Sequence, residues 1–341
     1  RRKGVSVLEI NGKKEAVSFS DFTFQYESQS EPTLHNINLK IYEGEKILII
    51  GPSGSGKSTI GHCINGLAPY FYKGEIKGEL KIYDEVLNGI FEHSKYVGTA
   101  LQDSDAQFVG LSVAEDIAFA LENDTVETDI MKKQVNEIAK FVKIEDLLKM
   151  KPHDLSGGQK QKVSLAGIMV EDAKIILYDE PLANLDPLSG KYAVELIDEL
   201  HNRKKLTTII IEHRLEDVLH KKVDRIIVID KGKIIIDDTP DNILKSDILK
   251  KINIREPLYI SALKYSGVDL NKYSEVADMG KMDLSDIKDN ILNWIKHNPA
   301  KEKENNSETI LGLKNIDFSY YSCTFKKKSY FCRLINVFFT H

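Results

Sequence analysis

Cysteine and long apolar runs are the features that this sequence has least of. Its three cysteines, at positions 63, 323 and 332, form no disulfide framework and no Cys-x-x-Cys pair, which indicates a reducing compartment and a buried, structural Cys63. The longest apolar runs are ILII at 47–50 and KIILY at 174–178, far short of the ~20 residues that a membrane span needs. With no secretory leader either, we expect a soluble chain that reaches a membrane only through a partner.

A surplus of positive charge is also lacking. The net charge of −5 argues against a protein that binds nucleic acid mainly by electrostatics. The 341 residues, 42% of them hydrophobic, suffice for one large domain or two smaller ones. The sequence begins without Met, so we expect the natural N-terminus to lie further upstream.

Glycine is concentrated in GPSGSGKST (51–59), directly after the apolar run KILII. Glycines at this spacing let a backbone approach a phosphate closely, and the helix that follows offers its N-terminal dipole. Lys57 is expected to reach the β- and γ-phosphates, and Ser58 to coordinate Mg²⁺. The alternative is a tight glycine turn, but a strand before the motif and a helix after it favour a nucleotide site.

The rest of the pattern predicts an α/β fold. Apolar and polar residues alternate at 17–27, which predicts a half-exposed strand, and two more strands follow within 33–51. From about 111 to 150 the pattern becomes helical. Three β-branched runs come next, KIILYD, LTTIIIE and DRIIVID, with a helix over 189–202 between the first two. Their weak alternation is typical of parallel strands covered on both faces.

Paired carboxylates end the first of these runs. Adjacent strand residues point to opposite sides, so Asp179 can hold Mg²⁺ through water while Glu180 takes a proton from an attacking water. A strand that merely ends in acidic residues is the alternative. With Lys57 and Ser58 upstream, the combination favours phosphoryl transfer to water.

A second candidate anion site lies at LSGGQ, where Ser156, Gly157 and Gly158 begin a helix. An ordinary helix cap is the alternative. One ATPase domain needs only one cradle for the γ-phosphate. A second cradle therefore implies two domains that face each other, each closing over the other's nucleotide.

The ordered motifs GPSGSGKST, LQDSDAQ, LSGGQ, IILYDEP, ANLD and IIEHR closely resemble those of the ATP-binding cassette (ABC) ATPases. The resemblance covers roughly residues 15–245. It implies a P-loop NTPase (RecA-like) core, an N-terminal antiparallel β subdomain and an inserted α-helical subdomain at about 100–165. It also implies an ATPase that uses ATP and Mg²⁺ and is coupled to transport.

Carried over residue by residue, the resemblance implies catalytic roles for Glu180 as the base, His213 as a contact of the γ-phosphate, and Gln102 as a contact of the attacking water. The implied metal contacts are Ser58, Gln102 and Asp179. Tyr26 is expected to stack on adenine, and Asp186 to communicate across a dimer. The full set expected to bind nucleotide is Tyr26, Gly51, Ser53, Gly54, Gly56, Lys57, Ser58, Thr59, Ser156, Gly157, Gly158, Gln159 and Asp186.

A finer resemblance is to the energy-coupling-factor importers, because a second glutamine, Gln107, follows Gln102 at their spacing. Members with two cassettes in one chain include importers of thiamine or its hydroxymethylpyrimidine precursor. The resemblance implies vitamin import, a transmembrane coupling subunit, a substrate-binding membrane component and no nucleic acid. It implies a location on the cytoplasmic face of the bacterial cell membrane.

The domains expected are an ABC ATPase domain at 1–248, a partly helical linker at 249–308, and the start of a second ABC domain at 309–341. The last expectation comes from LGLKNIDFSY (311–320), which matches VSFSDFTFQY (17–26) position for position. Two alternating strands that look alike by chance are the alternative. Because no second glycine cradle follows, we interpret the tail as a truncated second cassette, with about the last 20 residues read out of frame.

Two other functions stay open at this level. One is a tandem cassette protein outside transport, such as a ribosome-associated translation factor, which usually has a long basic helical linker. The other is an inactive remnant. The partner cassette is expected in a longer form of the same chain, or otherwise in a homodimer or heterodimer.

Overall fold

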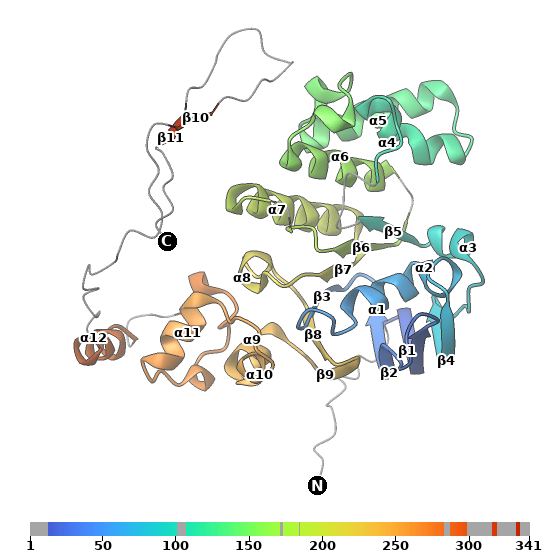
Figure 1. Ribbon diagram of the computed structural model, residues 1–341. Coiled ribbons are helices and arrows are strands. Elements are labelled where there is room, and N and C mark those ends of the chain that lie inside the picture. The colour runs from blue at the N-terminus through green and yellow to red at the C-terminus, as the bar shows by residue number, and fades with distance from the viewer. Residues whose placement is uncertain are drawn as a thin grey trace. The chain divides into compact units, whose positions relative to one another are not determined.

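The computed structural model describes residues 13–100, 107–170, 173–183, 185–282, 287–298, 316–318 and 332–334. It divides into two units, residues 1–291 and 292–341, which are described separately. Figure 1 shows the elements of both. Within the described residues, no helix is both long and apolar enough to cross a membrane.

A mixed six-stranded sheet with the order β5-β6-β7-β3-β8-β9 forms the centre of the first unit, as far as the described residues show. Its strands are β3 (Lys46–Ile50), β5 (Val97–Ala100), β6 (Ile175–Asp179), β7 (Thr207–Ile211), β8 (Arg225–Asp230) and β9 (Lys233–Asp238). All neighbours are parallel except β8 and β9. Every residue of β3, β6 and β7 is buried, which confirms that the unbroken apolar runs are strands covered on both faces.

A three-stranded antiparallel sheet packs beside it, with the order β2-β1-β4. Its strands are β1 (Glu15–Tyr26), β2 (Leu34–Tyr42) and β4 (Gly74–Ile82). Phe22 and Phe24 are fully buried in one cluster with Ile47 and Ile49 of the central sheet. Helices α1 (Lys57–Ile64), α2 (Leu67–Tyr70) and α3 (Ile90–Ser94) accompany it. This sheet is the expected N-terminal β subdomain.

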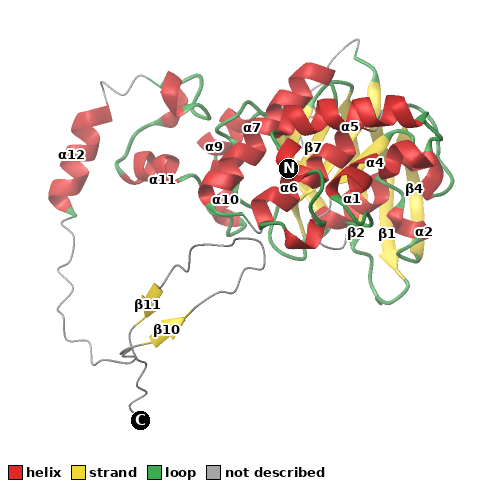
Figure 2. Ribbon diagram, turned by 90° about the horizontal axis from the view of Figure 1, so that it is seen from above, coloured by secondary structure: helices red, strands yellow, loops and turns green. Residues whose placement is uncertain are grey.

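Helices α4 (Val113–Asn123), α5 (Thr128–Val142) and α6 (Gly157–Val170) form the expected helical subdomain between β5 and β6. Two short 3₁₀ helices, η2 (Glu145–Leu147) and η3 (Pro152–Asp154), connect them. A capping box starts α4, in which Ser112 and Glu115 each accept a backbone N–H of the other. Figure 1 shows this group at the opposite end of the unit from β1, β2 and β4. Figure 2 shows helices around the strands of the unit.

Helix α7 (Pro187–Lys204) lies between β6 and β7, and α8 (Leu215–Val218) follows β7. The chain then continues through α9 (Pro240–Lys245), α10 (Ile248–Lys251), α11 (Leu258–Tyr265), η4 (Leu270–Lys272) and η5 (Met279–Lys281). Leu249, Ile260 and Val276 are fully buried in the same core cluster as α7. The stretch predicted as a linker from 249 therefore packs on the core of the first unit through much of its length.

Helix α12 (Ile287–His297) crosses the boundary between the two units, and Ile287 at its start is buried. In the second unit, β10 (Ile316–Phe318) pairs antiparallel with β11 (Cys332–Leu334). Strand β10 lies inside the predicted repeat at 311–320, whose other residues lie outside the described part. The second cassette therefore stays a prediction.

Candidate functional site

The loop 51–56 joins β3 to α1, and two of its glycines are required by geometry. A Cβ at Gly51 would lie 2.1 Å from the carbonyl oxygen of Ile229, so no side chain fits. Gly56 caps α1 with a φ of 101°, in the left-handed region that glycine tolerates best. The sequence motif is thus a backbone loop held against β8, with the N-terminus of α1 behind it.

Lys57 folds back over this loop. Its side chain is buried, and Nζ donates to the carbonyl oxygens of Gly51 and Pro52 at 3.0 Å each. Burial lowers the pKa of Lys57, while the charges of Glu180, Asp179 and Glu212 oppose that shift. An ammonium group that binds main-chain carbonyls at the mouth of a glycine loop can bind phosphate oxygens in their place. The donors present therefore fit a nucleoside triphosphate.

Ser58 and Asp179, the two described residues predicted to hold Mg²⁺, lie in direct contact. Ser58 Oγ donates to Asp179 Oδ1 at 3.2 Å across the gap between α1 and the end of β6. Hydroxyl and carboxylate oxygens are ligands that Mg²⁺ prefers, and phosphate oxygens and water usually complete its shell. No cluster of three or more His, Cys, Asp or Glu that could hold a metal occurs among the described residues. The pair therefore fits a metal that arrives with the nucleotide.

Burial raises the pKa of Asp179 to about 6, and the neighbouring charges of Glu180 and Glu212 add to this, against the Ser58 hydrogen bond and Lys57. Below about pH 4 the folded and unfolded chains both keep the proton. Between about pH 4 and 6 only the unfolded chain releases it, so the stability of the folded state falls as pH rises through this window.

We therefore expect Asp179→Asn to stabilise the nucleotide-free and Mg²⁺-free chain above pH 6 by about 1–3 kcal/mol, and to have little effect near pH 4. Thermal unfolding of both proteins from pH 4 to 8 measures this. A difference in melting temperature that stays constant across the range would contradict it.

Glu180 follows Asp179 in a strained conformation. Its φ is 49°, and its N–H donates to the carbonyl of Ile211 at 2.8 Å. A left-handed backbone costs a residue with a Cβ about 1–2 kcal/mol, and such strain concentrates at functional sites. The turn separates the direction of Glu180 from that of Asp179, in keeping with separate roles for the two carboxylates.

His213 lies two residues beyond the end of β7, with 57% of its side chain exposed. Its Nδ1 lies 3.1 Å from Oε1 of Glu212, and the Glu212 side chain is fully buried. The sequence reasoning selected His213 and missed Glu212, although IIEHR places a carboxylate directly beside it.

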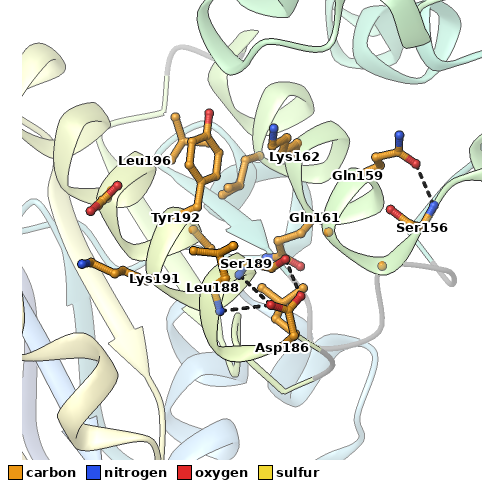
Figure 3. A pocket seen from close by; sticks show the side chains of 16 residues that line it. Ser156, Gln159, Gln161, Lys162, Asp186, Leu188, Ser189, Lys191, Tyr192 and Leu196 are labelled. Carbon is orange, nitrogen blue, oxygen red and sulfur yellow. Dashed lines mark hydrogen bonds between the residues drawn. The ribbon is translucent and has the colours of Figure 1, made fainter.

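The LSGGQ segment begins α6 at one end of a cavity of about 870 Å³ between α6 and α7 (Figure 3). Ser156, Gly157, Gly158 and Gln159 line the cavity together with Asp186 from the start of α7. The Ser156 N–H donates to Gln159 Oε1 at 2.9 Å, so the glutamine side chain closes the first turn. The residues of the predicted second cradle therefore line one concavity, and nucleotide binding there stays a prediction.

Asp186 has a structural role that the sequence analysis did not predict. As the N-cap of α7, its Oδ1 accepts the N–H groups of Leu188 and Ser189 at 3.0 and 3.1 Å (Figure 3). The Ser189 hydroxyl donates to Oδ2 at 2.5 Å, and this bond is the main reason that the pKa of Asp186 is lowered. The sequence Asp-Pro-x-Ser is a helix-start signal that predicts such a cap.

The other described residues predicted to bind nucleotide or metal lie in different surroundings. The Tyr26 hydroxyl is 3.1 Å from Thr59 Oγ1, and its ring packs edge-on against Phe24, so Tyr26 lies beside α1. Stacking on adenine stays a prediction. Ser53 and Gly54 are exposed in the loop. Gln102 lies outside the described residues. Gln107 Oε1 accepts a hydrogen bond from the hydroxyl of Ser164, a residue of α6, at 2.9 Å.

Comparisons with known proteins show which families the chain resembles. Residues 34–183 match the family described as ABC transporter, and residues 246–318 match one described as ATP-binding cassette cobalt transporter. A putative ABC transporter ATP-binding protein of Clostridium perfringens is 54% identical over 310 residues, 90% of this chain and 55% of that protein. A putative ABC transporter ATP-binding protein of Vibrio parahaemolyticus is 51% identical over 306 residues, which are 89% of this chain and 53% of that protein. The chain spans about half the length of the curated relatives it matches.

Solved structures give the same result. CbiO1 of Clostridium perfringens, part of the ABC transporter complex CbiONQ, is similar with a TM-score of 0.63 and 28% identity, over 74% of this chain and all of that one. A dimeric ATP-binding cassette in a post-hydrolysis state, bound to ADP and phosphate, has a TM-score of 0.58 and 27% identity, over 65% of this chain and 98% of that one. ATPase domains of this kind bind ATP with Mg²⁺. The fold, the phosphate loop and these matches make the chain similar to the ATPases of ABC transporters.

Proposed function

We propose that this chain is the ATP-hydrolysing subunit of an energy-coupling-factor importer of the cobalt type. The observation that supports ATP hydrolysis best is the contact between Ser58 and Asp179, beside a phosphate loop over which Lys57 folds. The match of residues 246–318 to a cobalt-transporter family and the likeness to CbiO1 support the type of importer.

In this proposal Lys57 and the loop N–H groups bind the β- and γ-phosphates, while Ser58 and Asp179 hold the metal. Bound Mg²⁺ supplies charge neutralisation at the phosphates. Glu180 accepts a proton from the attacking water, and His213 contacts the γ-phosphate. Ser156 and Gly157 act on the nucleotide of a facing cassette, where the α6 N-terminus favours an anion.

The partners proposed are a transmembrane coupling subunit, a substrate-binding membrane component and a second cassette, at the cytoplasmic face of the bacterial cell membrane. The cargo proposed is a divalent cobalt ion, because residues 246–318 match a family described as ATP-binding cassette cobalt transporter. Vitamin import of the thiamine type stays a prediction without such support. A ribosome-associated role has none either, since residues 246–318 match a transporter family.

Two copies of one cassette can build both composite sites if they pair about a two-fold axis. We therefore expect the ATPase rate of the purified chain to rise with the square of protein concentration at low concentration. A rate that is linear throughout would contradict paired sites, and no ATPase activity at any concentration would favour an inactive remnant.

Cargo is tested separately. When the chain is produced with the membrane proteins of its neighbouring genes, cells are expected to take up labelled cobalt in an ATP-dependent manner. Uptake of labelled thiamine instead would replace the cobalt assignment. Copurification with ribosomes and not with membranes would reject the importer.

A further inference from the structure

Two side chains that flank His213 hold the loop that follows Glu180. Glu212 Oε2 accepts the N–H of Leu182 at 3.1 Å. Arg214 Nη1 donates to the carbonyl oxygen of Leu182 at 2.9 Å and to that of Leu185 at 3.2 Å. Both main-chain polar groups of Leu182 are therefore bound by side chains from the end of β7.

The contacts of Glu212 and Arg214 are buried or partly buried and involve charged groups. Glu212 has no exposed surface, and its Oε1 accepts the backbone N–H groups of His213 at 2.8 Å and Arg214 at 3.1 Å. The Leu182 side chain is likewise fully buried. Arg214 is oriented by Asp217, whose Oδ2 accepts from Nε at 2.6 Å. Hydrogen bonds to ionised groups are about twice as strong as neutral ones, and a buried carboxylate that loses its donors is costly.

These contacts join two segments that are far apart in sequence. One is the 212–214 segment with His213. The other consists of the described residues 181–183 and 185, which come between Glu180 and Asp186 in the sequence. Since Glu212 binds backbone of both segments, neither can shift without breaking a bond to a buried carboxylate. Arg214 adds a second link, because its Nη1 donates to the carbonyl oxygens of both Leu182 and Leu185 while Nε of the same planar group binds Asp217.

We propose that Glu212 and Arg214 are positioning residues that make the His213 segment move as one body with Leu182 and Leu185. The link ties the proposed γ-phosphate contact to the segment between the proposed base and the helix cap at Asp186. It rests on the proposed function for its catalytic consequence, but its mechanical part concerns this chain alone.

Hydrogen exchange of the Leu182 amide tests the mechanical part. In Glu212→Gln, an isosteric change that removes the charge, we expect this amide to exchange at least tenfold faster than in the wild type. Arg214→Lys is the second variant, because lysine keeps the charge but not the planar fork. We expect faster exchange of the Leu182 and Leu185 amides there as well.

Glu45→Gln is the matched control. Glu45 is another buried carboxylate, 2% exposed, that accepts from Arg225 at 2.9 Å and from the Tyr42 N–H at 2.9 Å, away from this loop. Its loss is expected to lower the melting temperature to a similar degree without changing exchange at Leu182. Equal exchange in wild type and Glu212→Gln, or equal acceleration in Glu45→Gln, would overturn the proposal.

Kinetics test the catalytic part. Glu212→Gln is expected to lower kcat at least tenfold while the Kd for ATP changes less than threefold, and Glu45→Gln to leave both near wild type. Glu212→Gln combined with Arg214→Lys should lose little more than either alone, since both act on one link. A wild-type kcat in Glu212→Gln would refute the catalytic part. A wild type that hydrolyses no ATP would reject the proposed function, and hydrogen exchange would still decide the link.

Discussion

Lys57→Ala is expected to abolish tight ATP binding and leave the chain folded. The Lys57 ammonium now binds the carbonyls of Gly51 and Pro52 and would move to the β- and γ-phosphates. Hydrogen bonds to charged groups contribute about 1.5–3 kcal/mol each, so losing two of them corresponds to at least a hundredfold weaker binding. The fold should persist, because burial already disfavours this charge, as the lowered pKa of Lys57 indicates.

Calorimetric titration with ATP and Mg²⁺ measures the effect. Lys46→Ala is the matched control, because Lys46 is also buried but pairs with Asp198, and its loss should change ATP affinity by less than threefold. ATP affinity of Lys57→Ala within threefold of the wild type would show that the loop is a structural turn and not a phosphate cradle.

Glu180→Gln is expected to bind ATP normally and to lower turnover by about 10²–10⁴-fold, the usual contribution of a general base. Glutamine has the same shape, so the left-handed turn at this position and its bond to the Ile211 carbonyl can persist. Because ATP then binds but is not hydrolysed, the paired state should accumulate.

Steady-state hydrolysis and size-exclusion chromatography with ATP measure both effects. Glu199→Gln, an exposed carboxylate on α7, is the control and should behave as the wild type. Turnover of Glu180→Gln within threefold of wild type would remove Glu180 from the role of base and leave that role to another group.

The sequence alone predicts the strands β3, β6, β7 and β8 of the central sheet, because their signals are local, but it does not predict β5. The runs at β3, β6 and β7 are apolar without alternation, and this is the pattern that a strand covered on both faces shows. The phosphate loop is equally local, since Gly51 and Gly56 are required by backbone geometry within six residues. Here the pattern and the structure agree.

What could not be predicted depends on contacts between distant segments. Nothing in IIEHR says that Glu212 and Arg214 would bind Leu182, because that contact exists only once β6 and β7 pair. The first part of the stretch after 248 is similar: α10 and α11, of four and eight residues, are too short for a clear period. They are held by tertiary bonds such as that from Ala277 N to Asp241 Oδ1, at 2.9 Å.

The most direct test is a structure of the Glu180→Gln chain with ATP and Mg²⁺. We expect each ATP to lie between two cassettes, with its terminal phosphate bound by Lys57 of one and by Ser156 and Gly157 of the other. An ATP enclosed by a single cassette, with the LSGGQ segment facing solvent or protein and no nucleotide, would contradict a shared site.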